Sequence, residues 1–224
     1  MIEAGRVTVD GVVVMEPGHR VDPGSSAVAV DGAVVGDRER RRTIMMYKPA
    51  GVLSAVSDSF GGKTVADLIR GSVRERLVPV GRLDKDSEGL LLMSNDGGFV
   101  LRMTHPRFGH EKTYVVRAAG RWSEEKLRVL RSPVTMPEDG YVTRPARVRV
   151  LAGPVANVTT LEFKLGEGRK RQIRRLCSAA HLVVLSLKRT AVGALELPPD
   201  MKPGEWRDVG EAEMAMAESA GRGR

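Results

Sequence analysis

Residues 81–98 read GRLDKDSEGLLLMSNDGG, and this stretch decides how the middle of the chain folds. Asp84 stands between Arg82 and Lys85 in a loop that is bracketed by glycines. The apolar run 90–93 follows and ends in a turn sequence, a pattern that predicts a buried strand. A carboxylate between two cations is usually a solvated charged turn, so the loop alone predicts no function.

The segments on either side mix strand and helix patterns without the regular rhythm of a parallel fold. Thr64 and Ser123 are expected to cap the two helices that they precede. We therefore expect an α+β fold with a mostly antiparallel mixed sheet. Strands are predicted within 43–48, 90–94, 112–120, 146–153, 157–168 and 182–197, and helices within 64–71, 98–105, 123–134 and 168–180.

The N-terminal segment has a different character from the rest. Residues 5–14 and 27–35 alternate valine with other residues around Asp-Gly pairs, which is typical of hairpins. Residues 36–42, GDRERRR, have no apolar anchor and are predicted to form a linker. The expected parts are a β-rich unit with its linker at 1–42, a main domain at 43–210 and a flexible tail at 211–224.

Composition limits the function classes. Of 224 residues, 42% are hydrophobic, so a sizeable core is possible, and the net charge of +8 favours a polyanionic partner, with nucleic acid ahead of a membrane surface. The single cysteine, Cys177, excludes an intramolecular disulfide and a cysteine-based metal site. No His spacing is typical of a metal site, and there is no apolar run long enough to span a membrane and no signal-peptide pattern. We expect a cytoplasmic protein.

A dense basic segment opens the last predicted helix. Its like charges have few nearby acids to compensate them, and an RNA backbone would relieve their repulsion. A solvated basic face is the alternative interpretation. The residues concerned are Arg169, Lys170, Arg171, Arg174 and Arg175, with Gln172 as a further hydrogen-bonding group.

Tyr114 follows Lys112 in a predicted strand. A strand tyrosine is commonly half-buried packing, but an aromatic ring beside a basic surface can also stack on an RNA base. The chain has only 4% aromatic residues, so it lacks the row of exposed rings of a general single-strand binder.

Taken together, five segments resemble the motifs of the RsuA-type pseudouridine synthases, the family that includes the RluB, RluE and RluF groups. They stand in the family's order and span residues 43–210. The similar segments are MYKPAGV (46–52), VGRLDKDSEGLLLMSNDG (80–97), HEKTYVV (110–116), GEGRKRQIRRL (166–176) and GEWR (204–207).

This resemblance implies an enzyme that breaks the N-glycosidic bond of a uridine in ribosomal RNA, turns the base and rejoins it through carbon, without metal or cofactor. Asp84 would be the catalytic carboxylate, which must be ionised and is favoured in that form by nearby arginines. Whether it attacks the sugar, adds to the base or promotes elimination stays open. Tyr114 would stack on the flipped uracil, with assistance to proton removal as a further role, and Arg174 would pair with Asp84. Arg82 would support base flipping or contact the RNA backbone. The RNA contacts expected are Lys48, Lys112, Arg169, Lys170, Arg171, Gln172 and Arg175.

Residues 2–11 and 17–21 resemble the second half of an S4 RNA-binding module, whose helical first half is absent from the sequence. We expect either a start upstream of Met1 or a degenerate module. The protein is expected to act as a monomer. Within the family, the HEKTY segment slightly favours rRNA of the small ribosomal subunit as the substrate, although KDSEGL and RQIRR also resemble the large-subunit branches.

Two other functions compete with the synthase. An RNA-binding protein without activity would have no use for a carboxylate facing phosphates. A glycoside hydrolase would need a second carboxylate beside Asp84, and Asp86 or Glu88 would have to supply it.

Overall fold

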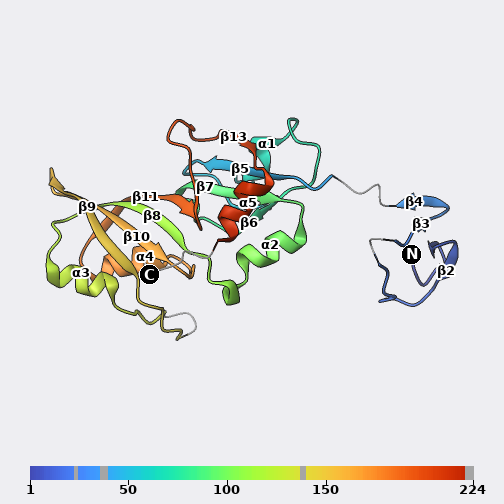
Figure 1. Ribbon diagram of the computed structural model, residues 1–224, viewed down its shortest axis with the longest axis horizontal. Helices are drawn as coiled ribbons and strands as arrows, with labels where there is room; N and C mark the ends of the chain where they lie inside the picture. Colours follow the sequence, from blue (N-terminus) through green and yellow to red (C-terminus); the bar gives the residue numbers. More distant parts are fainter. Residues whose placement is uncertain (23–24, 36–39, 137–139, 220–224) are drawn as a thin grey trace. The chain divides into compact units, whose positions relative to one another are not determined.

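The computed structural model describes residues 1–22, 25–35, 40–136 and 140–219 (Figure 1). The chain divides into two compact units, Met1–Arg40 and Arg41–Arg224. Most of the linker that we predicted at 36–42 lies outside the described residues. In the ranges above, no helix combines the length and the apolar character of a membrane span.

The N-terminal unit is a four-stranded antiparallel sheet in the order β2-β1-β3-β4. Both predicted hairpins are present, and Asp10-Gly11 and Asp31-Gly32 form their turns with positive φ at both residues. That conformation matches the right-handed twist of the flanking strands, which explains the Asp-Gly pairs. The likeness of this unit to an S4 module stays a prediction. Its strands are β1 (Val7–Val9), β2 (Val12–Val14), β3 (Val28–Val30) and β4 (Ala33–Val35).

The second unit is built on a nine-stranded sheet whose main path runs β13-β5-β7-β11-β8-β10-β9, with β6 beside β7 and β12 beside β11. Every pair is antiparallel except β7 with β11, which confirms the mostly antiparallel mixed sheet. The strands are β5 (Thr43–Lys48), β6 (Val78–Val80), β7 (Glu88–Ser94), β8 (Lys112–Ala119), β9 (Arg147–Val155), β10 (Val158–Leu165), β11 (Val183–Val192), β12 (Leu195–Glu196) and β13 (Trp206–Asp208).

The parallel pair joins the two halves of this sheet and depends on one glycine. Gly89 lies opposite Arg189 in the register of β7 and β11. Its φ is +107°, and a Cβ at this position would lie 2.2 Å from the Arg189 carbonyl oxygen. Only glycine permits this backbone approach, so the end of the GRLDKDSEGL stretch fixes where the two half-sheets meet.

The helices cover separate parts of the sheet (Figure 1). Helices α3 and α4 pack on β8–β11, helices α2 and α5 cover β7 together with β12, and α1 lies on the opposite face of β5 and β7. Thr64 and Ser123 cap α1 and α3 as predicted. The helices are α1 (Val65–Ile69), α2 (Gly97–Thr104), α3 (Glu124–Arg131), α4 (Gln172–Ala179) and α5 (Glu211–Glu218), with a 3₁₀ turn at Pro106–Phe108.

Two expectations need correction. The segment 211–218, predicted to belong to a flexible tail, forms helix α5, and its Ala217 is fully buried against α2 and β12. The last basic helix begins at Gln172 rather than at Gly168, because Arg171 adopts a left-handed conformation with φ of 54° and ends the preceding loop. Arg169, Lys170 and Arg171 are therefore loop residues.

Candidate active site

The loop that carries Asp84 is held by the segment after β5. The Ser54 hydroxyl accepts a hydrogen bond from the Leu83 amide at 3.0 Å and donates one to the Leu83 carbonyl at 2.9 Å. The Gly51 amide donates to the Lys85 carbonyl at 2.7 Å. Two motifs that are 30 residues apart in the sequence are thus joined on either side of Asp84, and the backbone of the loop is fixed at both flanks.

Lys48 is the third anchor of this loop, and it corrects our prediction of an RNA contact. Its side chain is fully buried, and Nζ donates to the carbonyls of Pro49 at 2.9 Å, Lys85 at 3.4 Å and Ser87 at 2.6 Å. Burial lowers the pKa of Lys48 to about 8. An ammonium group with no exposed surface is placed to position the loop and not to meet RNA at the surface.

The loop at 166–171 is organised by a carboxylate that sequence reasoning missed. Glu167 accepts hydrogen bonds from the Tyr141 hydroxyl at 3.0 Å, the Arg144 amide at 2.8 Å and the Gln172 side-chain amide at 2.7 Å. Gln172, predicted to contact RNA, is only 3% exposed, and its side-chain oxygen accepts from the Arg169 amide. Its hydrogen bonds shape the loop. The sequence signal that could have identified Glu167 is an acidic residue between two glycines, directly before a basic run.

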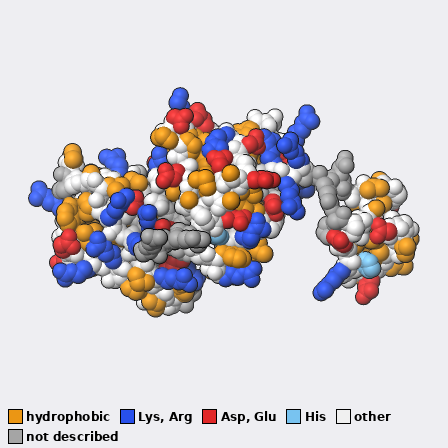
Figure 2. All heavy atoms as spheres, viewed as in Figure 1, with side chains coloured by type: hydrophobic (Ala, Val, Ile, Leu, Met, Phe, Trp, Pro, Cys, Tyr) orange, Lys and Arg blue, Asp and Glu red, His pale blue; other side chains and the backbone are white. Residues whose placement is uncertain are grey.

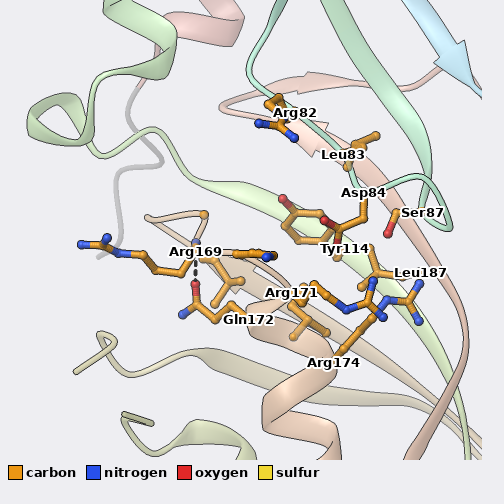
Figure 3. Close-up of a pocket in the computed structure, with 14 residues that line it drawn as sticks. Arg82, Leu83, Asp84, Ser87, Tyr114, Arg169, Arg171, Gln172, Arg174 and Leu187 are labelled. Carbon is orange, nitrogen blue, oxygen red and sulfur yellow. Dashed lines mark hydrogen bonds between the residues drawn. The ribbon is translucent and has the colours of Figure 1, made fainter. Parts of the chain in front are cut away.

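A cavity of about 330 Å³ opens where these loops meet, and we call it the Asp84 cavity. Figure 3 shows the Asp84 carboxylate beside the Tyr114 ring, with Arg171 and Arg174 on one side and Arg82 on the other. The cavity therefore collects three segments that resembled family motifs. Its lining is Arg82, Leu83, Asp84, Ser87, Tyr114, Leu165, Gly168, Arg169, Lys170, Arg171, Gln172, Ile173, Arg174 and Leu187.

The ion pairs at the cavity differ from our expectation. Arg174 was expected to pair with Asp84, but its Nη2 lies 3.1 Å from an Asp86 carboxylate oxygen, and Arg171 binds the same carboxylate at 3.3 Å. Asp86 is the nearer partner because the turn from Asp84 to Ser87 points it toward the start of α4. In the part of the chain that the structure describes, no hydrogen bond or ion pair joins the Asp84 carboxylate to another side chain.

Tyr114 is 8% exposed and lies in β8, so the packing and the ligand interpretations both keep support. Its neighbours Val116 and Phe163 belong to the core under α3 and α4. Its ring nevertheless lines the Asp84 cavity. A ring that is held by the core on one side and open to a cavity on the other gives a rigid surface for a planar ligand.

The remaining predicted residues fall at the rim or beside the cavity. Arg82 and Lys170 are exposed at the rim. Arg169 lies over the Tyr141 ring, with 3.5 Å from its Cζ to the ring centre. Arg175 points away, toward the Met136 sulfur at 3.4 Å, and Lys112 faces a second cavity described below.

On the face shown in Figure 2, charged side chains are distributed rather than collected in one patch. Figure 2 shows Lys and Arg side chains scattered over the visible face of the 41–219 unit, with Asp and Glu among them. In the described part of the chain, no group of three or more His, Cys, Asp or Glu side chains is arranged to hold a metal ion.

Comparisons with known proteins agree with this geometry. A family model described as RNA pseudouridylate synthase matches residues 42–179. The chain is 37% identical to an uncharacterized RNA pseudouridine synthase of Aquifex aeolicus, over 96% of this chain and 84% of that protein. It is 38% identical to ribosomal large subunit pseudouridine synthase B of Bacillus subtilis, over 88% of this chain and 79% of that protein. A crystal structure of a pseudouridylate synthase superimposes with a TM-score of 0.73 at 24% identity, covering 96% of this chain and 90% of that one, which supports the fold.

Proposed function

This chain belongs to the RNA pseudouridylate synthase family, and from that premise we propose that it isomerises a uridine of ribosomal RNA with Asp84 as the reacting carboxylate. Action on RNA as a pseudouridine synthase follows from the family. The choice of ribosomal RNA, the role of Asp84 and the flipping of the target base are our proposal.

The reaction is an isomerisation, so all atoms of the nucleotide are kept. The bond between C1′ of the ribose and N1 of uracil breaks, the base turns, and a bond forms between C1′ and C5. C5 then loses its proton and N1 gains one. A base stacked in RNA hides C1′ and C5 from any side chain, and this is why the target must be turned out of its stack.

The observation that carries the proposal is an ionisable side chain left free in a shaped cavity. Asp84 is half-buried and held on a loop that Ser54, Gly51 and Lys48 fix. Its carboxylate has no partner among the described side chains, whereas Asp86 is bound by two arginines. An unpaired carboxylate keeps its lone pairs available, and the three possible routes through sugar, base or elimination all begin from it.

The cavity also supplies groups that suit uridine. The Tyr114 ring offers a stacking surface beside Asp84, and such stacking contributes about 1–3 kcal/mol per base. Arg171 and Arg174 line the same cavity and bring guanidinium N–H donors, which suit the oxygens of the substrate.

The name of the Bacillus subtilis relative supports ribosomal RNA and favours the large subunit, against the slight lean of the HEKTY segment. Transcripts of the small- and large-subunit rRNA, each labelled in uridine and incubated separately with the protein, decide between the two. Mapping pseudouridines in rRNA from a strain that lacks the gene then gives the nucleotide.

The decisive test of the chemistry compares two carboxylates of the same loop. Asp84→Asn keeps the shape of the side chain and removes its charge, so we expect no pseudouridine formation with RNA affinity unchanged or slightly higher. Residual turnover within about tenfold of the wild type, about 1.4 kcal/mol of barrier, would contradict the assignment.

Asp86→Asn is the matched variant, because Asp86 is engaged by Arg171 and Arg174 and is not free to react. We expect it to retain at least about a tenth of the wild-type rate. A glycoside hydrolase would need two carboxylates and would release free uracil, so uracil release that is lost equally in both variants would favour that alternative. Glu88 is not a rival, because it accepts a hydrogen bond from the Tyr47 hydroxyl at 3.0 Å.

A further inference from the structure

A second cavity of about 260 Å³ adjoins the Asp84 cavity, and we call it the flanking cavity. The two share Arg82, Tyr114, Gly168 and Arg169 in their linings, so Tyr114 stands between them. The volume of the flanking cavity is slightly below the roughly 300 Å³ at which sites for drug-sized ligands begin. The cavity is therefore suitable for a group of about one nucleotide and too small for a duplex.

The flanking cavity contains two largely buried cations for which the described residues supply no counterion. Lys112 is largely withdrawn from solvent, and its Nζ donates to the His110 carbonyl at 2.8 Å. Arg189 is 3% exposed, and its Nε donates to the Leu90 carbonyl at 2.7 Å. Among the described residues, no carboxylate lies within 4 Å of either charged group.

Such an arrangement is costly in the free protein. Burial is the main cause that lowers the pKa of Lys112 to about 8, and the neighbouring Arg189 lowers it further. Buried charges are normally paired, and two cations close together oppose each other. Among the described residues of the lining the single acid is Glu167, and it is already bound by Tyr141, Arg144 and Gln172. An anionic ligand would compensate the charge that the described residues leave unbalanced.

His110 belongs to the same lining and is held in place by the protein. It is 6% exposed, and its Nε2 lies 3.1 Å from the Arg102 carbonyl. Burial lowers the pKa of His110, which favours its neutral form. His110 therefore adds no positive charge to balance, and the charge of the cavity comes from Lys112 and Arg189. Cations in a cavity of this size suit a nucleotide, because its phosphate supplies the negative charge.

We propose that the flanking cavity binds the nucleotide next to the target uridine in the RNA, with its phosphate against Lys112 and Arg144. This inference rests on the proposed function. Continuity of the two cavities across Tyr114 argues for a neighbouring nucleotide of the same strand rather than a separate ligand. Arg144 lines the cavity from the exposed side, where a phosphate would enter.

The test compares two ligands of the full chain at pH 7. Uridine 5′-monophosphate can fill only one of the two cavities at a time, whereas the trinucleotide ApUpA offers a nucleotide to both at once. We expect the trinucleotide to bind wild-type protein at least tenfold more tightly. Lys112→Met should weaken trinucleotide binding at least fivefold, leave the monophosphate within twofold, and lower the slope of log affinity against log salt by about 0.7.

The control is Lys164→Met. Lys164 lies on β10, opposite Thr113 in the register with β8, and its position alternates with the core residues Phe163 and Leu165, so it faces away from both cavities. It should leave both affinities unchanged. Arg144 is exposed and is not part of the hydrophobic core, so Arg144→Gln should fold. This variant should lower the affinity for the trinucleotide only, and it serves as the test if Lys112→Met does not fold.

Three results would overturn the proposal. The first is a trinucleotide that binds no more tightly than the monophosphate, and the second is an equal decrease in affinity for both ligands in Lys112→Met and Arg144→Gln. The third is that inorganic phosphate, added at equal concentration, removes the difference in affinity between the trinucleotide and the monophosphate. The last would make the cavity a simple anion site. Failure here is separate from failure of the proposed function, because Asp84→Asn is judged by pseudouridine formation and should bind both ligands as the wild type does.

Discussion

Replacing Lys48 by methionine separates a loop-positioning residue from an RNA contact. The change keeps a long apolar side chain and removes the ammonium group that donates to Pro49, Lys85 and Ser87. Each of the two short hydrogen bonds, at 2.6 and 2.9 Å, involves a charged donor and contributes about 1.5–3 kcal/mol, so about 3–6 kcal/mol is lost.

A compensating gain comes from burial. The pKa of Lys48 falls from 10.5 to about 8, and this difference of 2.5 corresponds to about 3 kcal/mol of destabilisation by the buried charge. The methionine variant does not have this destabilisation. The net decrease in the free energy of unfolding is therefore roughly 0–3 kcal/mol. The Asp84 loop loses its tether, and a displacement of about 1 Å at a reacting group can lower a rate by about 100-fold.

We expect Lys48→Met to reduce kcat by about 100-fold while the Kd for rRNA stays within twofold. The measurements are urea unfolding, single-turnover pseudouridine formation and RNA binding as a function of salt. Lys63→Met, at an exposed lysine, is the matched control and should change none of them. A preserved kcat together with weaker RNA binding and a salt slope lowered by about 0.7–0.9 would refute the reasoning and restore Lys48 as an RNA contact.

Other predictions concern side chains with distinct surroundings. Tyr114→Phe should keep RNA binding while Tyr114→Ala should lose binding and activity, since stacking contributes about 1–3 kcal/mol; wild-type behaviour of the alanine variant would make the ring a packing residue. Gly89→Ala should lower the free energy of unfolding by about 2–6 kcal/mol, from backbone strain and from the clash with Arg189, and an unchanged urea midpoint would contradict this. The pKa of Lys112 is about 8 in the folded protein and 10.5 ordinarily, so the unfolded chain binds more protons between pH 8 and 10.5. The free energy of unfolding of the wild type, relative to Lys112→Met, should therefore rise by up to about 3 kcal/mol over this range. A difference between the two proteins that does not change with pH would refute this. Burial raises the pKa of Cys177 to about 12, so a thiol reagent at pH 8 should modify it only when the chain is unfolded.

The sequence by itself determined the elements whose causes are local. Helix caps at Thr64 and Ser123 depend on hydrogen bonds to residues three positions ahead, and the Asp-Gly turns depend on the backbone preferences of two neighbours. The alternation of buried and partly buried residues in β10 is likewise visible in its sequence. The same local signals, in the order of known motifs, were sufficient to indicate the family and the α+β class.

Only the tertiary structure decided what the polar side chains near Asp84 do. Lys48 and Gln172 resemble RNA contacts in the sequence, but packing buries both and turns their donors onto the protein's own backbone and Glu167. Arg174 meets Asp86, 88 positions away, because a turn and a helix start happen to face each other. A long polar side chain has many rotamers, and the contact it makes is selected by chain segments that are distant in the sequence, so no local pattern specifies it.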